Sequence, residues 1–187
     1  MNVTTLFEPE ELRDLALPLL GQPIDAMVPA LHAVLRRRYG DHIRADPPWM
    51  LNNAGGAMGT MCVMHFSVTE YLIVFGSPIG TEGHTGRFFA DDWFIILDGE
   101  QWAYGAGELD RREYRAGDIH HLPRGVARGY RIPDHCWALE YARGFIPAML
   151  PFGVADIASS TLDVRTLAKT LMVAGSSVLS ELRRGKI

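Results

Sequence analysis

The chain has 187 residues, 48% of them hydrophobic, and a formal net charge of −4. This length suits one domain with a sizeable core, and the weak negative charge without any basic stretch argues against nucleic acid as a partner. Two cysteines, Cys62 and Cys136, are too few for a disulfide framework or a zinc site, which favours a reducing compartment.

The N-terminal segment carries three glutamates within its first eleven residues, where a secretory signal would carry positive charge. We therefore expect no signal peptide. We also expect no spanning helix, because no window reaches the roughly 18 uninterrupted apolar residues that one needs. Apolar side chains at helical spacing over residues 9–38, interrupted by Gly21 and Pro23, predict two amphipathic helices.

Residues 48–142 have a different sequence pattern, in which short runs of β-branched and aromatic residues alternate with Gly, Pro and Asp turn signals. They predict eight antiparallel strands, and hence a barrel or jelly roll, over residues 60–66, 70–75, 87–97, 101–104, 112–115, 118–122, 127–132 and 136–141. Asp98 and Gly99 read most simply as a turn. The Gly-rich segment 53–59 lacks the setting of a dinucleotide site or a P-loop, so we expect it to serve tight backbone packing.

From residue 146 onward the pattern returns to helix, with Pro147 near a first turn and Ser160 and Asp163 spaced like a capping box. One helical face is apolar and carries Val164, Leu167, Leu171, Val178 and Leu182. Such a face usually covers a core, but a small barrel needs few of them. An oligomer contact or a face lying on a membrane is therefore an equal alternative.

Part of the β-region has the spacing of a cupin barrel signature. Segment 117–125 matches the second half of that signature, whose metal-binding His is replaced by Arg128. In the first half Asp92 occupies the acid position, whereas the two His positions hold Gly86 and Phe88. The pattern predicts a cupin-like barrel and argues against its usual metal.

The adjacent His120 and His121 invite a metal-site interpretation, but neighbours on a strand point to opposite faces. At most one of the two can reach a common interior site. We favour one His packed inward with a hydrogen bond and the other in solvent, and we expect neither a metal nor another cofactor.

Glu140 is an acid within an apolar strand, on the face that it shares with Ala138. It can pair with Arg143 or another Arg, or it can be buried without a cation, in which case its pKa is raised and it suits proton transfer. Asp92 shares its strand face with Phe94 and would project inward, whereas Asp91 would point out. Two carboxyl groups in one apolar cavity can share a proton, one as acid and one as base.

The sequence resembles the sterol C8 isomerases of fungi and the sigma-1 receptor of animals from about residue 53 to 167. The matching motifs are residues 53–56 (NAGG), 58–59 (MG), 70–71 (EY), 80–86 (GTEGHTG), 90–94 (ADDWF), 99–102 (GEQW), 140–144 (EYARG) and 146–147 (IP). The resemblance implies mainly β structure with flanking helices. It divides a single domain, 1–187, into N-terminal helices (1–47), a cupin-like barrel (48–145) and C-terminal membrane-facing helices (146–187).

The same resemblance implies that Glu140 meets a ligand's ammonium group or, in the enzymes, a carbocation. The receptor's second acid would fall at Phe94, whereas the pattern around Asp92 is similar to the fungal enzymes, which favours isomerase over receptor. The residues implied to line the pocket are Met61, Tyr71, Phe75, His120, Tyr130 and Leu150.

The resulting functional hypothesis is a sterol Δ8–Δ7 isomerase that moves a ring double bond with the carboxyls of Glu140 and Asp92. The alternative is a non-catalytic, sigma-receptor-like binder of amphipathic amines or lipids. The resemblance also implies inhibition by cationic amines, a homotrimer, and peripheral attachment to the cytosolic face of a membrane.

Overall fold

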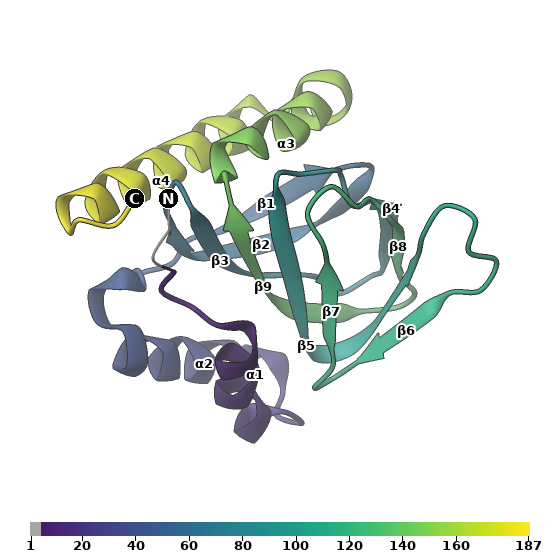
Figure 1. Ribbon diagram of the computed structural model, residues 1–187, viewed down its shortest axis with the longest axis horizontal. Coiled ribbons are helices and arrows are strands. Elements are labelled where there is room, and N and C mark those ends of the chain that lie inside the picture. Colours follow the sequence, from purple (N-terminus) through teal and green to yellow (C-terminus); the bar gives the residue numbers. More distant parts are fainter. Residues whose placement is uncertain (1–4) are drawn as a thin grey trace.

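The chain forms a nearly closed antiparallel barrel flanked by helices on two sides, as seen in a computed structural model that describes residues 5–187 (Figure 1). The first four residues of the acidic N-terminal segment lie outside the described part. The strands are β1 (Trp49–Ala54), β2 (Ala57–Phe66), β3 (Glu70–Ser77), β4 (Thr81–His84), β5 (Ala90–Tyr104), β6 (Arg112–Arg115), β7 (Ile119–Leu122), β8 (Gly129–Ile132) and β9 (Cys136–Gly144). Their order is β1-β2-β3-β9-β5-β8-β4, with β6 and β7 also paired to β5. The predicted mainly β fold is confirmed.

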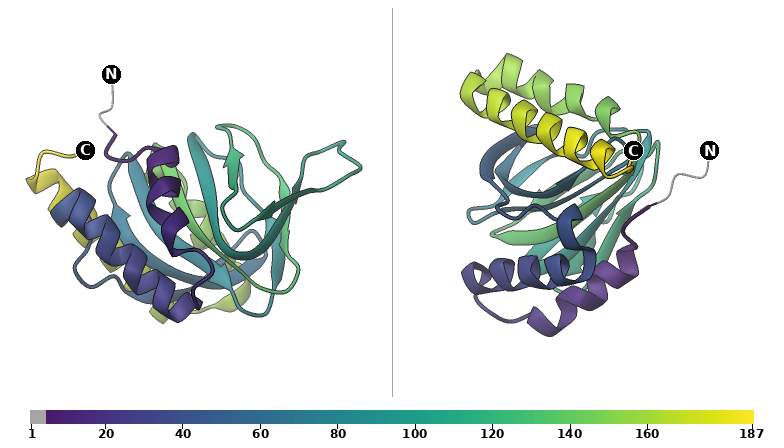
Figure 2. Two further views of the ribbon diagram at one scale, coloured as in Figure 1. Left: turned by 90° about the horizontal axis from the view of Figure 1, so that it is seen from below. Right: turned by 90° about the vertical axis from the view of Figure 1, so that its left-hand side faces the viewer.

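The two predicted N-terminal helices are also confirmed, as α1 (Pro9–Ala16) and α2 (Ile24–Tyr39), followed by short 3₁₀ turns η1 (Leu17–Leu19) and η2 (Gly40–His42). They cover the outer face of the sheet (Figure 2). Leu12, Leu31 and Leu35 are fully buried there against Leu139 and Tyr141 of β9. The odd-numbered face of β9 is thus the outer one, and Glu140 faces the interior as strand alternation predicts.

Two strands, β1 and β4, were not predicted. β1 is joined to β2 by a two-residue turn in which Gly55 and Gly56 have φ of +64° and +84°, values that favour glycine. The Gly-rich segment therefore makes a hairpin as well as the expected close packing. The amide of His84 on β4 donates to the Gly55 carbonyl at 2.8 Å, which brings the two ends of the strand order together.

The predicted turn at Asp98 and Gly99 is wrong. β5 continues through both residues, which pair with Trp137 and Cys136 of β9 after a bulge between Ile96 and Asp98. Gly99 has φ of +76°, and a Cβ there would lie 2.1 Å from the His135 carbonyl oxygen. Leu97 is the unpaired extra residue of this bulge, and Gly99 lets the strand continue past it in close contact with β9.

The C-terminal helices lie across the barrel from α1 and α2 (Figure 2). They comprise a 3₁₀ turn, η3 (Ile146–Ala148), then α3 (Leu150–Asp156), a π-helical turn η4 (Ile157–Thr161) and α4 (Val164–Arg183). Pro147 lies in the first turn of η3, as predicted. Within residues 5–187, none of the helices combines the length and apolar character needed to cross a membrane.

The predicted capping box at Ser160 is wrong, because Ser160 belongs to the π-helical turn. Leu162 has a left-handed φ of 53°, which ends that turn, and α4 begins afresh after Asp163. Asp163 itself caps α4 by accepting from the Thr166 amide at 3.0 Å.

Candidate active site

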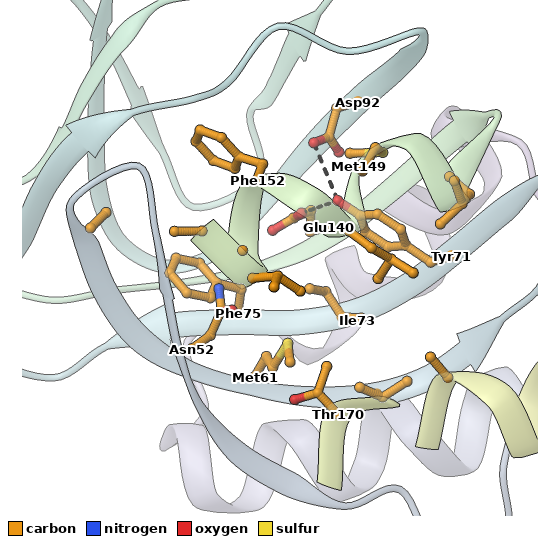
Figure 3. A pocket seen from close by; sticks show the side chains of 18 of the residues that line it. Asn52, Met61, Tyr71, Ile73, Phe75, Asp92, Glu140, Met149, Phe152 and Thr170 are labelled. Atoms are coloured by element: carbon orange, nitrogen blue, oxygen red, sulfur yellow. Dashed lines mark hydrogen bonds between the residues drawn. The ribbon is translucent and has the colours of Figure 1, made fainter. Parts of the chain in front are cut away.

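A largely apolar cavity occupies the barrel interior beneath α3 and α4 (Figure 3). Its walls come from the inner faces of β1, β2, β3, β5, β8 and β9 and from the helices above them. Phe75, Phe88, Phe94 and Phe152 give it an aromatic lining. Such a surface suits an apolar ligand with few polar groups.

Two acids face this cavity, Glu140 from β9 and Asp92 from β5. The hydroxyl of Tyr71, on β3, lies between them: it donates a short hydrogen bond to Glu140 Oε1 and lies 3.4 Å from Asp92 Oδ2 (Figure 3). The three side chains come from three neighbouring strands, so the site depends on the order β3-β9-β5.

Strand register explains why one hydroxyl can reach both carboxyls. Tyr71 and Asp92 each pair with Ala142 of β9, from opposite sides. The small methyl of Ala142 leaves open space between them, and Glu140 projects into it from two residues earlier on the same face. A larger side chain at position 142 would fill the place where the three groups meet.

Burial controls the protonation of this cluster. Burial raises the pKa of Glu140 to about 7, although the hydrogen bond from Tyr71 opposes the rise. Burial, followed by the nearby charge of Glu140, raises the pKa of Asp92 well above its ordinary value. Asp92 Oδ1 is buried and has no hydrogen-bond partner within residues 5–187. The pair therefore holds a proton at neutral pH, with Glu140 the better supported anion.

The alternative ion pair between Glu140 and Arg143 does not form. Arg143 lies on the opposite face of β9, where it contacts Glu8 at 3.5 Å and stacks over the Trp93 ring. Asp91 also points outward, as predicted, and contacts His121 at 3.1 Å. Asp92 is therefore the acid of β5 that faces the cavity.

Most residues that the resemblance assigned to the pocket do line the cavity: Met61, Tyr71, Phe75, Tyr130 and Leu150. His120 is fully buried but is not among the lining residues, because its ring lies between Phe94 and Tyr114. His121 is exposed, so the predicted division of the His pair is confirmed.

His120 instead supports a cavity residue that the sequence did not single out. Its Nδ1 lies 3.1 Å from Gln101 Oε1, and its Nε2 accepts from Arg128 at 2.8 Å. Arg128 occupies the cupin metal-ligand position noted above, so a guanidinium contacts the imidazole there. No cluster of three or more His, Cys, Asp or Glu side chains suited to a metal occurs in residues 5–187.

Comparisons with known proteins identify the family. The family model described as ERG2 and Sigma1 receptor like protein matches residues 1–186. The C-8 sterol isomerase of Neurospora crassa is 50% identical, with 97% of this chain and 73% of the relative covered. The C-8 sterol isomerase ERG2 of Gibberella zeae is 49% identical, covering 97% and 79%.

A more distant relative is the sigma non-opioid intracellular receptor 1 of Danio rerio, 36% identical over 96% of this chain and 82% of the relative. Among solved structures, an RmlC-like cupin from Shewanella frigidimarina is 16% identical with a TM-score of 0.43, covering 57% of this chain and 87% of its own. The family model and the close relatives together show that the chain belongs to the family of ERG2 and sigma-1 receptor like proteins.

Proposed function

We propose that this chain is a sterol Δ8–Δ7 isomerase whose chemistry is carried by Asp92, Glu140 and Tyr71. The observation that carries the proposal is two carboxyl groups joined through one tyrosine hydroxyl in an apolar cavity, without a Lys or Arg bonded to either within residues 5–187. The relatives named C-8 sterol isomerase, about half identical over nearly the whole chain, support the same reaction.

The reaction needs one acid that gives a proton and one carboxylate that takes a proton. Asp92, with its raised pKa and its unpartnered oxygen, supplies the proton that forms the new C9–H bond, and the alkene electrons leave a tertiary cation at C8. The carboxylate of Glu140 stabilises that cation and removes a proton from C7, so that the C–H electrons become the C7–C8 double bond.

The hydroxyl of Tyr71 then resets the pair. It accepts the proton from Glu140 while passing its own to Asp92, so the enzyme returns to its starting state with no net gain of protons or electrons. The short contact to Glu140 and the 3.4 Å contact to Asp92 place the hydroxyl for this transfer. The apolar lining excludes water that would otherwise capture the cation.

Attachment to a membrane, on its cytosolic face, is also part of the proposal. One side of α4 is buried: Ala174 lines the cavity, Ser177 accepts from Arg44, and Glu181 contacts His42 at 2.6 Å. Its other side exposes large apolar side chains: Val164 (69%), Met172 (67%), Leu179 (50%) and Leu182 (48%). A helix of this kind lies in the surface of a bilayer, from which a sterol could enter the cavity beneath it.

Inhibition by cationic amines and assembly as a homotrimer complete the proposal. An ammonium group would pair with the Glu140 carboxylate in place of the reaction's cation. The trimer is supported by the family resemblance alone, and cross-linking or light scattering of the detergent-solubilised protein measures it directly.

Exchange of one carboxyl tests the proposed activity. Glu140→Gln keeps the shape of the side chain but cannot form the carboxylate, so we expect turnover of a Δ8-sterol to fall at least a hundredfold. Glu82→Gln, a change of an exposed acid on β4, is the matched control and should keep wild-type turnover. Unchanged turnover in Glu140→Gln would show that the proposed mechanism is wrong.

A non-catalytic amine or lipid binder is the second candidate, because its ligand would use the same Glu140 carboxylate. The two candidates differ at Asp92, which only catalysis requires. Wild-type protein that binds a cationic amine, keeps that affinity in Asp92→Asn, and forms no product from any Δ8-sterol would favour the binder.

A further inference from the structure

Gln101 is a buried amide, 4% exposed, that lines the cavity on β5 beyond the bulge. No step of the proposed reaction uses it. Its position is nevertheless tightly defined by two side chains behind it, His120 and Arg128. A polar group held in this way inside an apolar cavity is suited to recognising one polar atom of a ligand.

The direction of this hydrogen-bond chain follows from the chemistry of its members. The Arg128 guanidinium can only donate, so His120 Nε2, at 2.8 Å, must be the unprotonated nitrogen that accepts. Burial, followed by the charge of Arg128, lowers the pKa of His120 to about 3, so the ring is neutral and carries its proton on Nδ1. Nδ1–H then donates to Gln101, and the atom that receives it must be Oε1.

With Oε1 occupied, the Nε2 amide group is the part of Gln101 that can donate into the cavity. His120 and Arg128 thus fix the orientation of an amide that would otherwise be free to flip by half a turn. The stacking of His120 between Phe94 and Tyr114, at 5.4 and 4.4 Å between ring centroids, holds the imidazole in place.

Strand register gives the backbone separation between Glu140 and His120, the residue that bonds to Gln101. Glu140, Phe94 and His120 lie opposite one another on the adjacent strands β9, β5 and β7. Two inter-strand spacings separate Glu140 from His120, which is about 10 Å. The hydroxyl of a sterol lies on ring A and the reacting alkene borders ring B, so these two groups are closer together than the two backbones, which leaves room for the side chains that reach inward.

We propose that Gln101, oriented by His120 and Arg128, is a specificity-determining residue that donates a hydrogen bond to the ring-A hydroxyl oxygen of the sterol. This inference rests on the proposed function, because it names how the substrate of that same site is recognised. Gln101 touches the substrate, whereas His120 and Arg128 act through Gln101 and are positioning residues.

The test measures binding rather than turnover. The probe is a tritiated 3β-hydroxysterol with fully saturated rings, bound in detergent micelles and displaced by the unlabelled sterol or by its 3-deoxy counterpart. For the wild type we expect the hydroxysterol to bind roughly tenfold more tightly than the deoxy compound, the size of one neutral hydrogen bond. In Gln101→Leu this ratio should fall to about 1.

Three further variants separate recognition from damage to the fold. Asn52→Leu changes the cavity's other amide and should keep the wild-type ratio. His120→Phe should lower the ratio, and His120→Gln should restore part of it, since a second amide can accept from Arg128 and donate to Gln101. A ratio does not change merely because a variant folds to a smaller extent, which is why it is the chosen readout.

A wild-type ratio near 1, an unchanged ratio in Gln101→Leu, or loss of the ratio in Asn52→Leu instead would each overturn the inference. These outcomes are distinguishable from failure of the proposed function, because the saturated probe has no double bond to move. Turnover that survives in Glu140→Gln would contradict the proposed mechanism. The inference about Gln101 would still stand or fall on the measured binding ratio.

Discussion

Replacing Tyr71 by Phe removes a single oxygen atom from the centre of the site. That oxygen donates the hydrogen bond that Glu140 accepts and lies 3.4 Å from Asp92 Oδ2. The aromatic ring stays, with its stacking on Phe66 at 6.1 Å between centroids. The change therefore tests the hydroxyl with little disturbance of packing.

The size of the effect follows from the loss of a hydrogen bond to a charged group, which is worth about 1.5–3 kcal/mol. At about 1.36 kcal/mol per pH unit, the pKa of Glu140 should rise by about one to two units above its value of about 7. At pH 7 the carboxylate form would fall from about half of the molecules to roughly a tenth or less. Because only that form accepts the proton from C7, turnover at pH 7 should fall at least fivefold.

The assay is kcat/KM for a Δ8-sterol in Tyr71→Phe and wild type between pH 5 and 9. We expect the acidic limb of the profile to move upward by about one to two pH units, so that part of the lost activity returns at high pH. Loss of the proton return route should also lower the plateau. An acidic limb that stays where it is in the wild type would refute the coupling between Tyr71 and Glu140.

Three further predictions concern stability, measured by urea unfolding. Folding raises the pKa of Asp92, so the native state binds more protons than the unfolded state and loses stability as pH rises. Asp92→Asn should therefore gain stability relative to wild type as the pH rises from 5 to 8. A difference in unfolding free energy between the two proteins that stays constant over this range would contradict the prediction. Leu31→Ala opens a cavity under α2 on the outer face of the sheet and should lower the free energy of unfolding by about 2–5 kcal/mol. The kcat of the folded protein should not change, because the active site lies on the inner face. A changed kcat would contradict this separation of the two faces of the sheet. Buried Glu70 accepts from the Leu6 amide and pairs with Lys186 at 2.9 Å, and so links the N-terminal and C-terminal segments. Glu70→Ala should lower the free energy of unfolding by about 3–5 kcal/mol. A loss below 1 kcal/mol would show that this link contributes little to stability.

Strand alternation predicted the inner face of the barrel correctly. The two-residue period decides that Glu140 and Asp92 point inward and that Asp91 points outward, and the structure places all three so. The sequence leaves an ion pair of Glu140 with Arg143 open, and the structure excludes it, because three positions along a strand change the face. These are consequences of local geometry, which a sequence displays directly.

Features that depend on contacts between distant segments were not predictable in this way. Asp98 and Gly99 have the composition of a turn, yet pairing with β9 keeps them in one strand. The meeting of Tyr71 with both acids depends on the small Ala142 of β9, which pairs with Tyr71 on one side and with Asp92 on the other. Gln101 carries no signal of its own, since its role arises from His120, which lies on a different strand.

The measurement that tests the central claim most directly is a single turnover of a Δ8-sterol by excess enzyme that has been equilibrated in deuterium oxide, with the Δ7 product examined by mass spectrometry and NMR. If a carboxyl of the Asp92–Glu140 pair protonates the alkene, each product molecule carries one deuterium at C9, and Glu140→Gln yields almost no product. A Δ7 product without deuterium at C9 would mean that the hydrogen moves within the substrate, and the paired-acid account would be wrong.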